Sequence, residues 1–371
     1  MENCPKCNKI IDVKLAFCSA CGCALNDVVD SNTNTKPVIN SHFQKASDNI
    51  TEKLGLEKIE GFSIATFFSE TFRKHDPIEV ERLLTIGAID TTPEPHPSMG
   101  VLPTPWIFFR VLLGTMLAYL VFMFSWKEFE NLNLIPGLIM IGSFAVPLSV
   151  LILFFELNTP KNISIIKIIE LVITGGALSL LLSLILFSAT PLLGMFGASA
   201  AGLIEEAGKL AALLIVLRST NPFVRYKYRL NALLLGAAIG TGFAAFESAG
   251  YAFRYGLGMF GTVNTNAMLE IIQLRGLLSP FAHIIWTAIA ASAFWICRPL
   301  HNDLWSTLTS SKFLSLFSIP IGLHFIWNLP FEGPFMIKYV ILGFIGWIVI
   351  ISLLQSGLKE MAELEQHGDS K

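Results

Sequence analysis

The residues of this 371-residue chain that could do chemistry are carboxylates, imidazoles, an amine and an amide inside long apolar stretches. They are Glu205, Glu206, Lys209, Glu247, His283, His324 and Asn328. An ionisable side chain inside a bilayer costs at least about 2.5–3.5 kcal/mol on insertion scales, so each is a candidate for function. No membrane Ser or Cys flanked by a base accompanies them, which disfavours an acyl-enzyme. They favour hydrolysis by a water molecule that a glutamate or a bound metal ion activates, and the sequence leaves both open.

Glu205, Glu206 and Lys209 share one apolar stretch as Glu-Glu-Ala-Gly-Lys. Glu205 and Lys209 are four residues apart with the acid first, which is the better orientation for an ion pair on a helix. Such a pair would leave Glu206 free, about 100° around the helix. A purely structural ion pair therefore explains one glutamate and leaves the other unexplained.

Glu247 follows a stripe of small residues, Gly236, Gly240 and Ala244, that would let a neighbouring helix approach closely. Each histidine lies in an apolar stretch of its own. A single histidine in a membrane is usually a hydrogen bond between helices. Two of them, together with three carboxylates in other stretches, favour one polar cluster.

Eight apolar stretches must position these side chains. Each is about 20 residues long, enough to cross a hydrocarbon core of roughly 30 Å. They are residues 106–126, 134–155, 165–188, 199–217, 230–252, 277–297, 313–331 and 335–355. With 53% hydrophobic residues, 15% charged residues and a mean hydropathy of +0.60, the composition excludes an ordinary soluble globule. The sequence predicts an all-α polytopic membrane bundle with about eight transmembrane helices.

The loop charges predict the orientation of this integral membrane protein. Lys161, Lys167, Arg218, Arg225, Lys227, Arg229, Arg298, Lys312 and Lys359 lie on one side, against Lys127, Arg254, Arg275 and Lys338 on the other. The more basic side faces the cytoplasm, so both termini are expected there. At about 1.5 Å per residue, Glu206, Glu247, His283 and His324 all lie about 8–11 Å from the outer helix ends. The cluster would then open toward the extracytoplasmic side.

The net charge of −2 and the absence of a long basic run disfavour nucleic-acid binding.

The first 25 residues carry two CxxC pairs separated by ten residues. The pairs are Cys4 with Cys7 and Cys18 with Cys21. Four sulfurs at this spacing predict a structural zinc ion without an open coordination position. Thiols stay available for zinc in the reducing cytoplasm. The segment resembles the small zinc ribbons at the start of many prokaryotic membrane proteins, which places the chain in a prokaryotic cell membrane. The ribbon would dock a cytoplasmic protein partner, sense metal or cap the tether.

Composition divides the chain into five segments. They are a zinc ribbon (1–25), a flexible linker (26–60), cytoplasmic juxtamembrane helices (61–105), the transmembrane domain (106–356) and a cytoplasmic tail (357–371). The linker is rich in Asn, Ser, Thr, Asp and Lys and cannot bury a core. In the juxtamembrane segment, Asp76, Pro77 and Glu79 are expected to start a helix as N-cap, N1 and N3.

Four ordered motifs resemble the PrsW family of intramembrane peptidases, which is related to the CAAX-protease and bacteriocin-processing group. They are Glu205-Glu206-x-x-Lys209, Gly-Thr-Gly-Phe-x-x-x-Glu ending at Glu247, Arg275 with Pro280 and His283, and His324-x-x-Trp327-Asn328. The resemblance covers about residues 100–355. It implies a membrane-embedded protease that cuts a membrane-spanning protein near its extracytoplasmic end, as the first cut in regulated intramembrane proteolysis of anti-sigma factors.

Similarity to the CAAX-protease group also implies a role for each residue. Glu206 or Glu205 would be the base that activates water, and His283 would help to position it. His324 with Asn328 would form the oxyanion site. Glu247 stands where the CAAX group has a histidine, and whether a catalytic metal is bound stays open.

Two other functions fit a buried polar cluster. One is a non-catalytic membrane binding or immunity protein that packs through the cluster and uses the zinc ribbon as its partner module. The other is a transporter, which the sequence disfavours because no two Gly- or Pro-broken stretches occupy matching positions of an inverted repeat. Substitution of Glu206 separates the first from a peptidase, because only a peptidase would lose cleavage.

Overall fold

The computed structural model describes residues 2–3, 10–11, 46, 49–57, 64–75, 85–88, 91–218, 222–257, 264–301, 303–331 and 336–364. The chain divides into two compact units, Met1–Asn40 and Ser41–Lys371. In the first unit, strand β1 (Glu2–Asn3) pairs antiparallel with strand β2 (Ile10–Ile11). The four cysteines predicted to bind zinc lie outside the described residues, so the zinc ribbon stays a prediction.

The described part of the second unit is helical. Six stretches are long and apolar enough to cross a membrane: α4 (Ile107–Phe129), η2 with α5 (Leu132–Leu157), α6 to α7 (Ile165–Ala189), α10 (Arg229–Gly256), α11 to η8 (Thr265–Leu300) and α15 (Ile337–Ala362). The third stretch consists of α6 (Ile165–Glu170), the π-helical η3 (Leu171–Gly175) and α7 (Gly176–Ala189). An all-α membrane protein is therefore confirmed, with six such stretches among the described residues in place of the eight predicted.

Two of the predicted spans are shorter helices. They are α8 (Ala201–Leu217) and α14 (Ser311–Trp327), each of 17 residues. A helix of that length is about 25 Å long, less than a hydrocarbon core of roughly 30 Å. The residues before α8 form the 3-10 segment η4 (Pro191–Ala200), which Gly197 interrupts at a φ of 57°. Continuous apolar sequence therefore did not give continuous α-helix.

The predicted span 277–297 is the second half of a longer, broken stretch. Helix α11 (Thr265–Leu278) runs into the 3-10 turn η7 (Ser279–Phe281), and α12 (His283–Cys297) follows. Ala282 breaks the helix with φ −123° and ψ −132°, just after Pro280, which lacks a backbone N–H. His283 is consequently the first residue of α12 rather than a residue well inside a helix.

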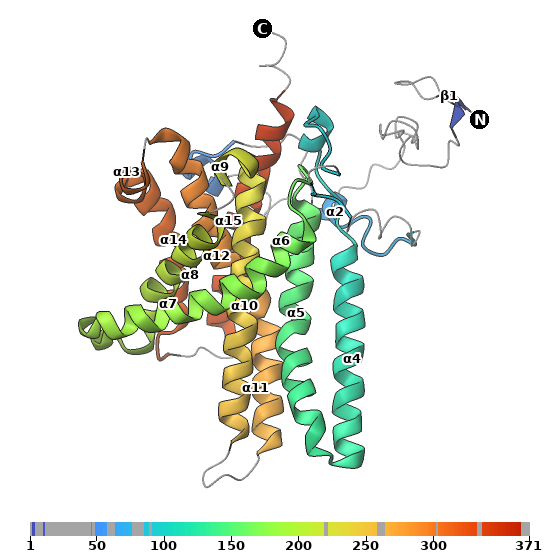
Figure 1. Cartoon of the computed structure of the whole chain (residues 1–371), viewed down its shortest axis with the longest axis vertical. Coiled ribbons are helices and arrows are strands. Elements are labelled where there is room, and N and C mark those ends of the chain that lie inside the picture. Colours follow the sequence, from blue (N-terminus) through green and yellow to red (C-terminus); the bar gives the residue numbers. More distant parts are fainter. Residues whose placement is uncertain are drawn as a thin grey trace. The chain divides into compact units, whose positions relative to one another are not determined.

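Helix α10 is the centre of the second unit, and α4 lies at its edge. Helix α10 buries residues over most of its length, from Leu230 to Gly256, whereas α4 buries Ile107 and Tyr119. It packs against α5, α7, α11, α12 and α15. Figure 1 shows α4, α5, α10 and α11 running lengthwise side by side, while α7 and α8 cross them at a steep angle.

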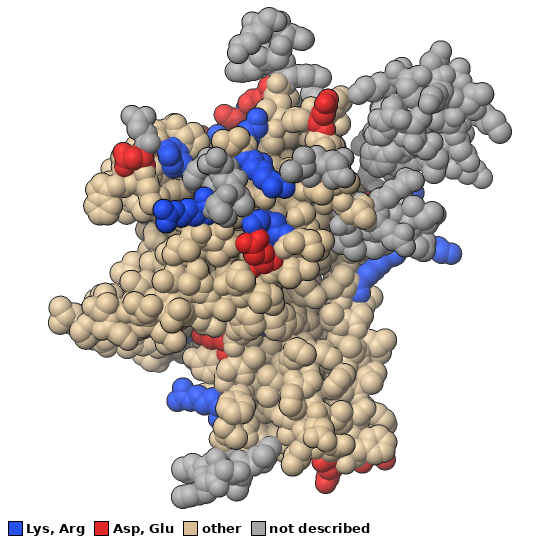
Figure 2. All heavy atoms as spheres, viewed as in Figure 1, with Lys and Arg blue, Asp and Glu red and all other residues tan. Residues whose placement is uncertain are grey.

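The remaining elements are short. They are α2 (Ile64–Phe67), η1 (Pro97–Gly100), α9 (Pro222–Arg225) and α13 (Leu304–Thr309). The juxtamembrane helix expected to begin at Asp76 lies outside the described residues. On the face drawn in Figure 2, Lys and Arg gather at the end of the molecule that holds α9 and α13, and a largely uncharged band lies beneath them.

The small-residue stripe of α10 allows α12 to approach closely. A Cβ at Gly240 would lie 2.6 Å from the backbone oxygen of His283 and 2.8 Å from Ile284 Cα. A Cβ at Gly236 would lie 2.5 Å from the backbone oxygen of Thr287. The first turn of α12 is therefore set by the absence of side chains on this face of α10.

We expect Gly240→Ala to destabilise the protein by about 1–3 kcal/mol, because an added methyl group must push α12 away from α10. Gly250→Ala is the matched control on the same helix, since a Cβ there meets nothing within 4 Å. Thermal unfolding in detergent measures the difference. Equal melting temperatures for the two variants would contradict the close approach.

Candidate active site

Four helices bring the polar residues of the apolar stretches together. Helix α8 supplies Glu205, Glu206 and Lys209, α10 supplies Glu247, α12 supplies His283 and α14 supplies His324. Glu206 and Lys209 are fully buried, and Glu205, His283 and His324 are at most 9% exposed. Residues up to 119 positions apart in the sequence thus form one cluster of charged and polar groups.

Lys209 lies in the middle of this cluster. Its Nζ donates to Glu206 Oε1 and to His283 Nδ1, both at 2.8 Å, and lies 4.0 Å from the ring centroid of Phe243. Glu205 Oε2 is farther away, at 3.6 Å. The predicted ion pair of Lys209 with Glu205 is therefore present, but the expectation that Glu206 stays free is wrong, because Glu206 is the closer partner. The spacing on α8 permits either pair, and the partners that α10 and α12 place around the ammonium favour Glu206.

Glu205 and Glu206 each keep one carboxylate oxygen, Oε2, without a hydrogen-bond partner among the described residues. Leaving a buried acceptor unpaired costs about 1–3 kcal/mol, more for a charged group. Such an atom usually marks the place of a water molecule or an ion. The two oxygens are thus free to bind a reactant.

The ring of His324 is held by Glu206 and Trp286. Nδ1 donates to Glu206 Oε1 at 3.0 Å, and the Trp286 ring stacks at 4.4 Å between centroids. With its proton on Nδ1, the ring presents a free lone pair at Nε2. This atom lies 3.8 Å from Glu205 Oε2, beyond hydrogen-bond distance.

Both nitrogens of His283 are engaged. Nδ1 accepts from Lys209, and Nε2 donates to Glu247 Oε2 at 3.0 Å. Arg275 holds Glu247 in turn, with NH2 2.5 Å from the same oxygen and Nε donating to Ser248 Oγ at 2.8 Å. Glu247 therefore fixes the orientation of the His283 ring, and Arg275 fixes Glu247.

The donor set of Glu205, His283 and His324 fits a divalent metal ion. One ligand atom from each lies within 4.8 Å of the others. Carboxylate oxygen and imidazole nitrogen are ligands that zinc accepts in catalytic sites. Both histidines also carry the carboxylate partner typical of metal-binding histidines, Glu206 and Glu247. Binding through His283 Nδ1 would require Lys209 to release that atom.

Asn328 caps the end of α14, and its amide donates to the backbone oxygen of Ala198 at 3.2 Å. Its predicted oxyanion role stays a prediction. The sequence reasoning did not single out Trp286 or Ser248. Trp286 lies one helical turn after His283, so its position on the same face of α12 was a usable signal.

Comparison with known proteins gives one family. A family model described as PrsW family intramembrane metalloprotease matches residues 146–354, which is more than half of the chain. The match begins after α4 and contains every residue of the cluster. The earlier resemblance, from about residue 100, extended farther toward the N-terminus. No curated protein and no solved structure matches the chain.

Proposed function

The chain belongs to the PrsW family of intramembrane metalloproteases, and from this premise we propose that the cluster around Lys209 is its hydrolytic centre. We further propose that the substrate is a membrane-spanning protein, cut near the extracytoplasmic end of its span as the first cut in regulated intramembrane proteolysis. The observation that carries the proposal is that Glu205, His283 and His324 come together from three different helices, beside two carboxylate oxygens that accept no hydrogen bond among the described residues.

In this proposal Glu205, His283 and His324 would hold the metal ion. A bound ion of this kind lowers the pKa of a water molecule and polarises the carbonyl of the scissile peptide. Glu206 holds the ring of His324 through Oε1, so that Nε2 points toward Glu205. Its second oxygen, Oε2, has no hydrogen-bond partner among the described residues and would accept the proton of the attacking water. Water must reach this oxygen by a local opening, because Glu206 is fully buried.

Lys209 and Glu247 have supporting roles. Lys209 balances the negative charge of the two adjacent glutamates, which would otherwise repel one another in a medium of low dielectric constant. Glu247 holds His283, as Glu206 holds His324. The oxyanion role of Asn328 requires its amide to leave Ala198 and turn toward the substrate.

For the rest of the chain, we base the proposed orientation on the basic residues of the loops. Both termini face the cytoplasm, and a zinc ion bound by Cys4, Cys7, Cys18 and Cys21 stabilises a ribbon that docks a cytoplasmic protein. Support comes from the two CxxC pairs and from the strands β1 and β2, which flank the first pair in the sequence. The segments 26–60, 61–105, 106–356 and 357–371 are proposed as linker, juxtamembrane helices, protease domain and tail.

The test is cleavage of single-pass membrane reporters by the full-length protein in lipid vesicles, compared with His324→Gln. We expect the variant to lose cleavage by about 10²–10⁴-fold, because a catalytic group contributes on that order. Fragments produced equally by both proteins would overturn the assignment. A variant that only melts earlier, with no cleavage by the wild type either, would favour the binding or immunity protein.

A further inference from the structure

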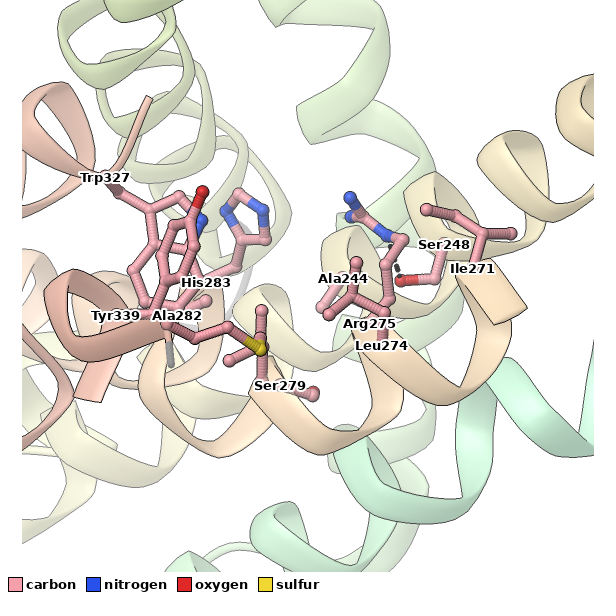
Figure 3. A pocket seen from close by; sticks show the side chains of 12 residues that line it. Ala244, Ser248, Ile271, Leu274, Arg275, Ser279, Ala282, His283, Trp327 and Tyr339 are labelled. Carbon is pink, nitrogen blue, oxygen red and sulfur yellow. Dashed lines mark hydrogen bonds between the residues drawn. The ribbon is translucent and has the colours of Figure 1, made fainter. Parts of the chain in front are cut away.

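A cavity of about 340 Å³ opens beside His283. It lies between α10, α11, the break at Ala282, the end of α14 and the start of α15. Figure 3 shows His283 with Trp327 and Tyr339 on one side of the cavity, and Arg275 with Ser248 and Ile271 on the other. The cavity is therefore continuous with the cluster that we assign to hydrolysis.

Most of the residues that line the cavity have aliphatic or aromatic side chains. Ala244, Leu274 and Leu278 contribute aliphatic groups, and Trp327 and Tyr339 contribute rings. These aliphatic and aromatic groups form a surface that suits an apolar side chain.

The charged group in the wall is already paired. Arg275 donates to Glu247 and Ser248, and its guanidinium lies 4.5 Å from the ring centroid of Tyr251. It is therefore not available as an anion receptor without breaking the support of His283. An acidic ligand is accordingly disfavoured.

One polar group in the wall lacks a partner. Ser279 is 7% exposed, and its Oγ makes no hydrogen bond among the described residues. It lies in η7, directly before the break that starts α12. Its Oγ has almost no accessible surface, so it adds no polar partner to the cavity.

We propose that this cavity is the subsite for one apolar side chain of the substrate next to the scissile bond. The inference rests on the proposed function and names its substrate class: spans with a Leu-sized or Phe-sized residue beside the cut.

The test uses the full chain in lipid vesicles and reporters whose single span carries Ala, Leu or Phe at each position in turn. Mass spectrometry of the fragments gives the residue beside the cut. Leu274 lines the cavity, whereas Leu277 lies on the same helix outside it, 68% exposed. We expect Leu274→Trp to lower the ratio of cleavage beside Phe to cleavage beside Ala by about tenfold or more. The size of an apolar pocket typically changes the preference between two substrates by roughly 10–200-fold. Leu277→Trp should leave the preference unchanged, and Leu274→Ala should shift it toward Phe.

Equal preferences in Leu274→Trp and Leu277→Trp would overturn the subsite while leaving the proposed function intact. Fragments that persist in Glu205→Gln would overturn the proposed function instead. If no reporter is cut, a photo-reactive residue at position 274 or 277 in the Glu205→Gln background decides the subsite. An adduct with the reporter from position 274 alone supports it, and no adduct from position 274 overturns it.

Discussion

Glu205→Gln is expected to abolish proteolysis while leaving the protein folded. Glu205 Oε2 accepts no hydrogen bond among the described residues, and Lys209 lies 3.6 Å from it but keeps its closer partner Glu206 at 2.8 Å, so the loss of one charge removes little native interaction. We expect the stability to change by less than about 1 kcal/mol, in the range of substitutions that break no buried network. Cleavage should fall by about 10³-fold or more, since a ligand of the activating ion is lost. Reporter cleavage and thermal unfolding are measured on the same preparation.

Glu206→Gln is the matched comparison one residue away. Glu206 Oε1 accepts from both Lys209 and His324, and all three side chains are at most 2% exposed. Removing one member of a buried ion pair costs about 3–5 kcal/mol. This variant should therefore lose both cleavage and stability. If the two variants lose equal stability, or if Glu205→Gln still cuts, the assignment of the two glutamates is wrong.

We expect the protein to bind metal ions at two independent sites. The purified full-length protein should bind two ions per chain, one in the proposed ribbon and one between Glu205, His283 and His324. Replacing the four ribbon cysteines by Ser should remove one ion and leave reporter cleavage measurable. His324→Ala should remove the other ion and abolish cleavage, because metal affinity typically depends on each ligand.

Elemental analysis of the gel-filtered proteins gives the stoichiometry. Chelation followed by addition of Zn²⁺ should remove and restore cleavage in the cysteine variant, where the ribbon no longer contributes. A stoichiometry that stays unchanged in His324→Ala would refute metal binding at the cluster. Unchanged metal content after loss of the cysteines would refute the ribbon site alone.

The residues of the cluster could be predicted from the sequence, because an ionisable side chain inside a bilayer costs free energy and therefore indicates a function. Glu205, Glu206, His283 and His324 stand out against apolar neighbours, and the structure places them together. Their pairing could not be predicted in the same way. Spacing on α8 alone allowed Lys209 to bind either glutamate, and the choice depends on His283 and Phe243, which reach the ammonium from other helices.

The helices were predictable where apolar sequence and α-helix coincide, as in α4, α10 and α15. They were not predictable where the backbone leaves α geometry inside an apolar run. Gly197 in η4 and Ala282 before α12 are two such places. Their signals, a glycine and the nearby Pro280, are weak, because Pro147 and Pro320 lie inside α5 and α14 without ending them. The break at Ala282 matters for function, since it places His283 at the start of α12.

The central claim is that this cluster hydrolyses membrane-spanning proteins, and one measurement tests it most directly. Membranes holding the full set of native membrane proteins are incubated with purified wild-type protein or with Glu205→Gln, and all new protein N-termini are identified by mass spectrometry. We expect new N-termini near the extracytoplasmic ends of membrane spans with the wild type and none of them with the variant. Identical sets of N-termini in the two samples would contradict the claim.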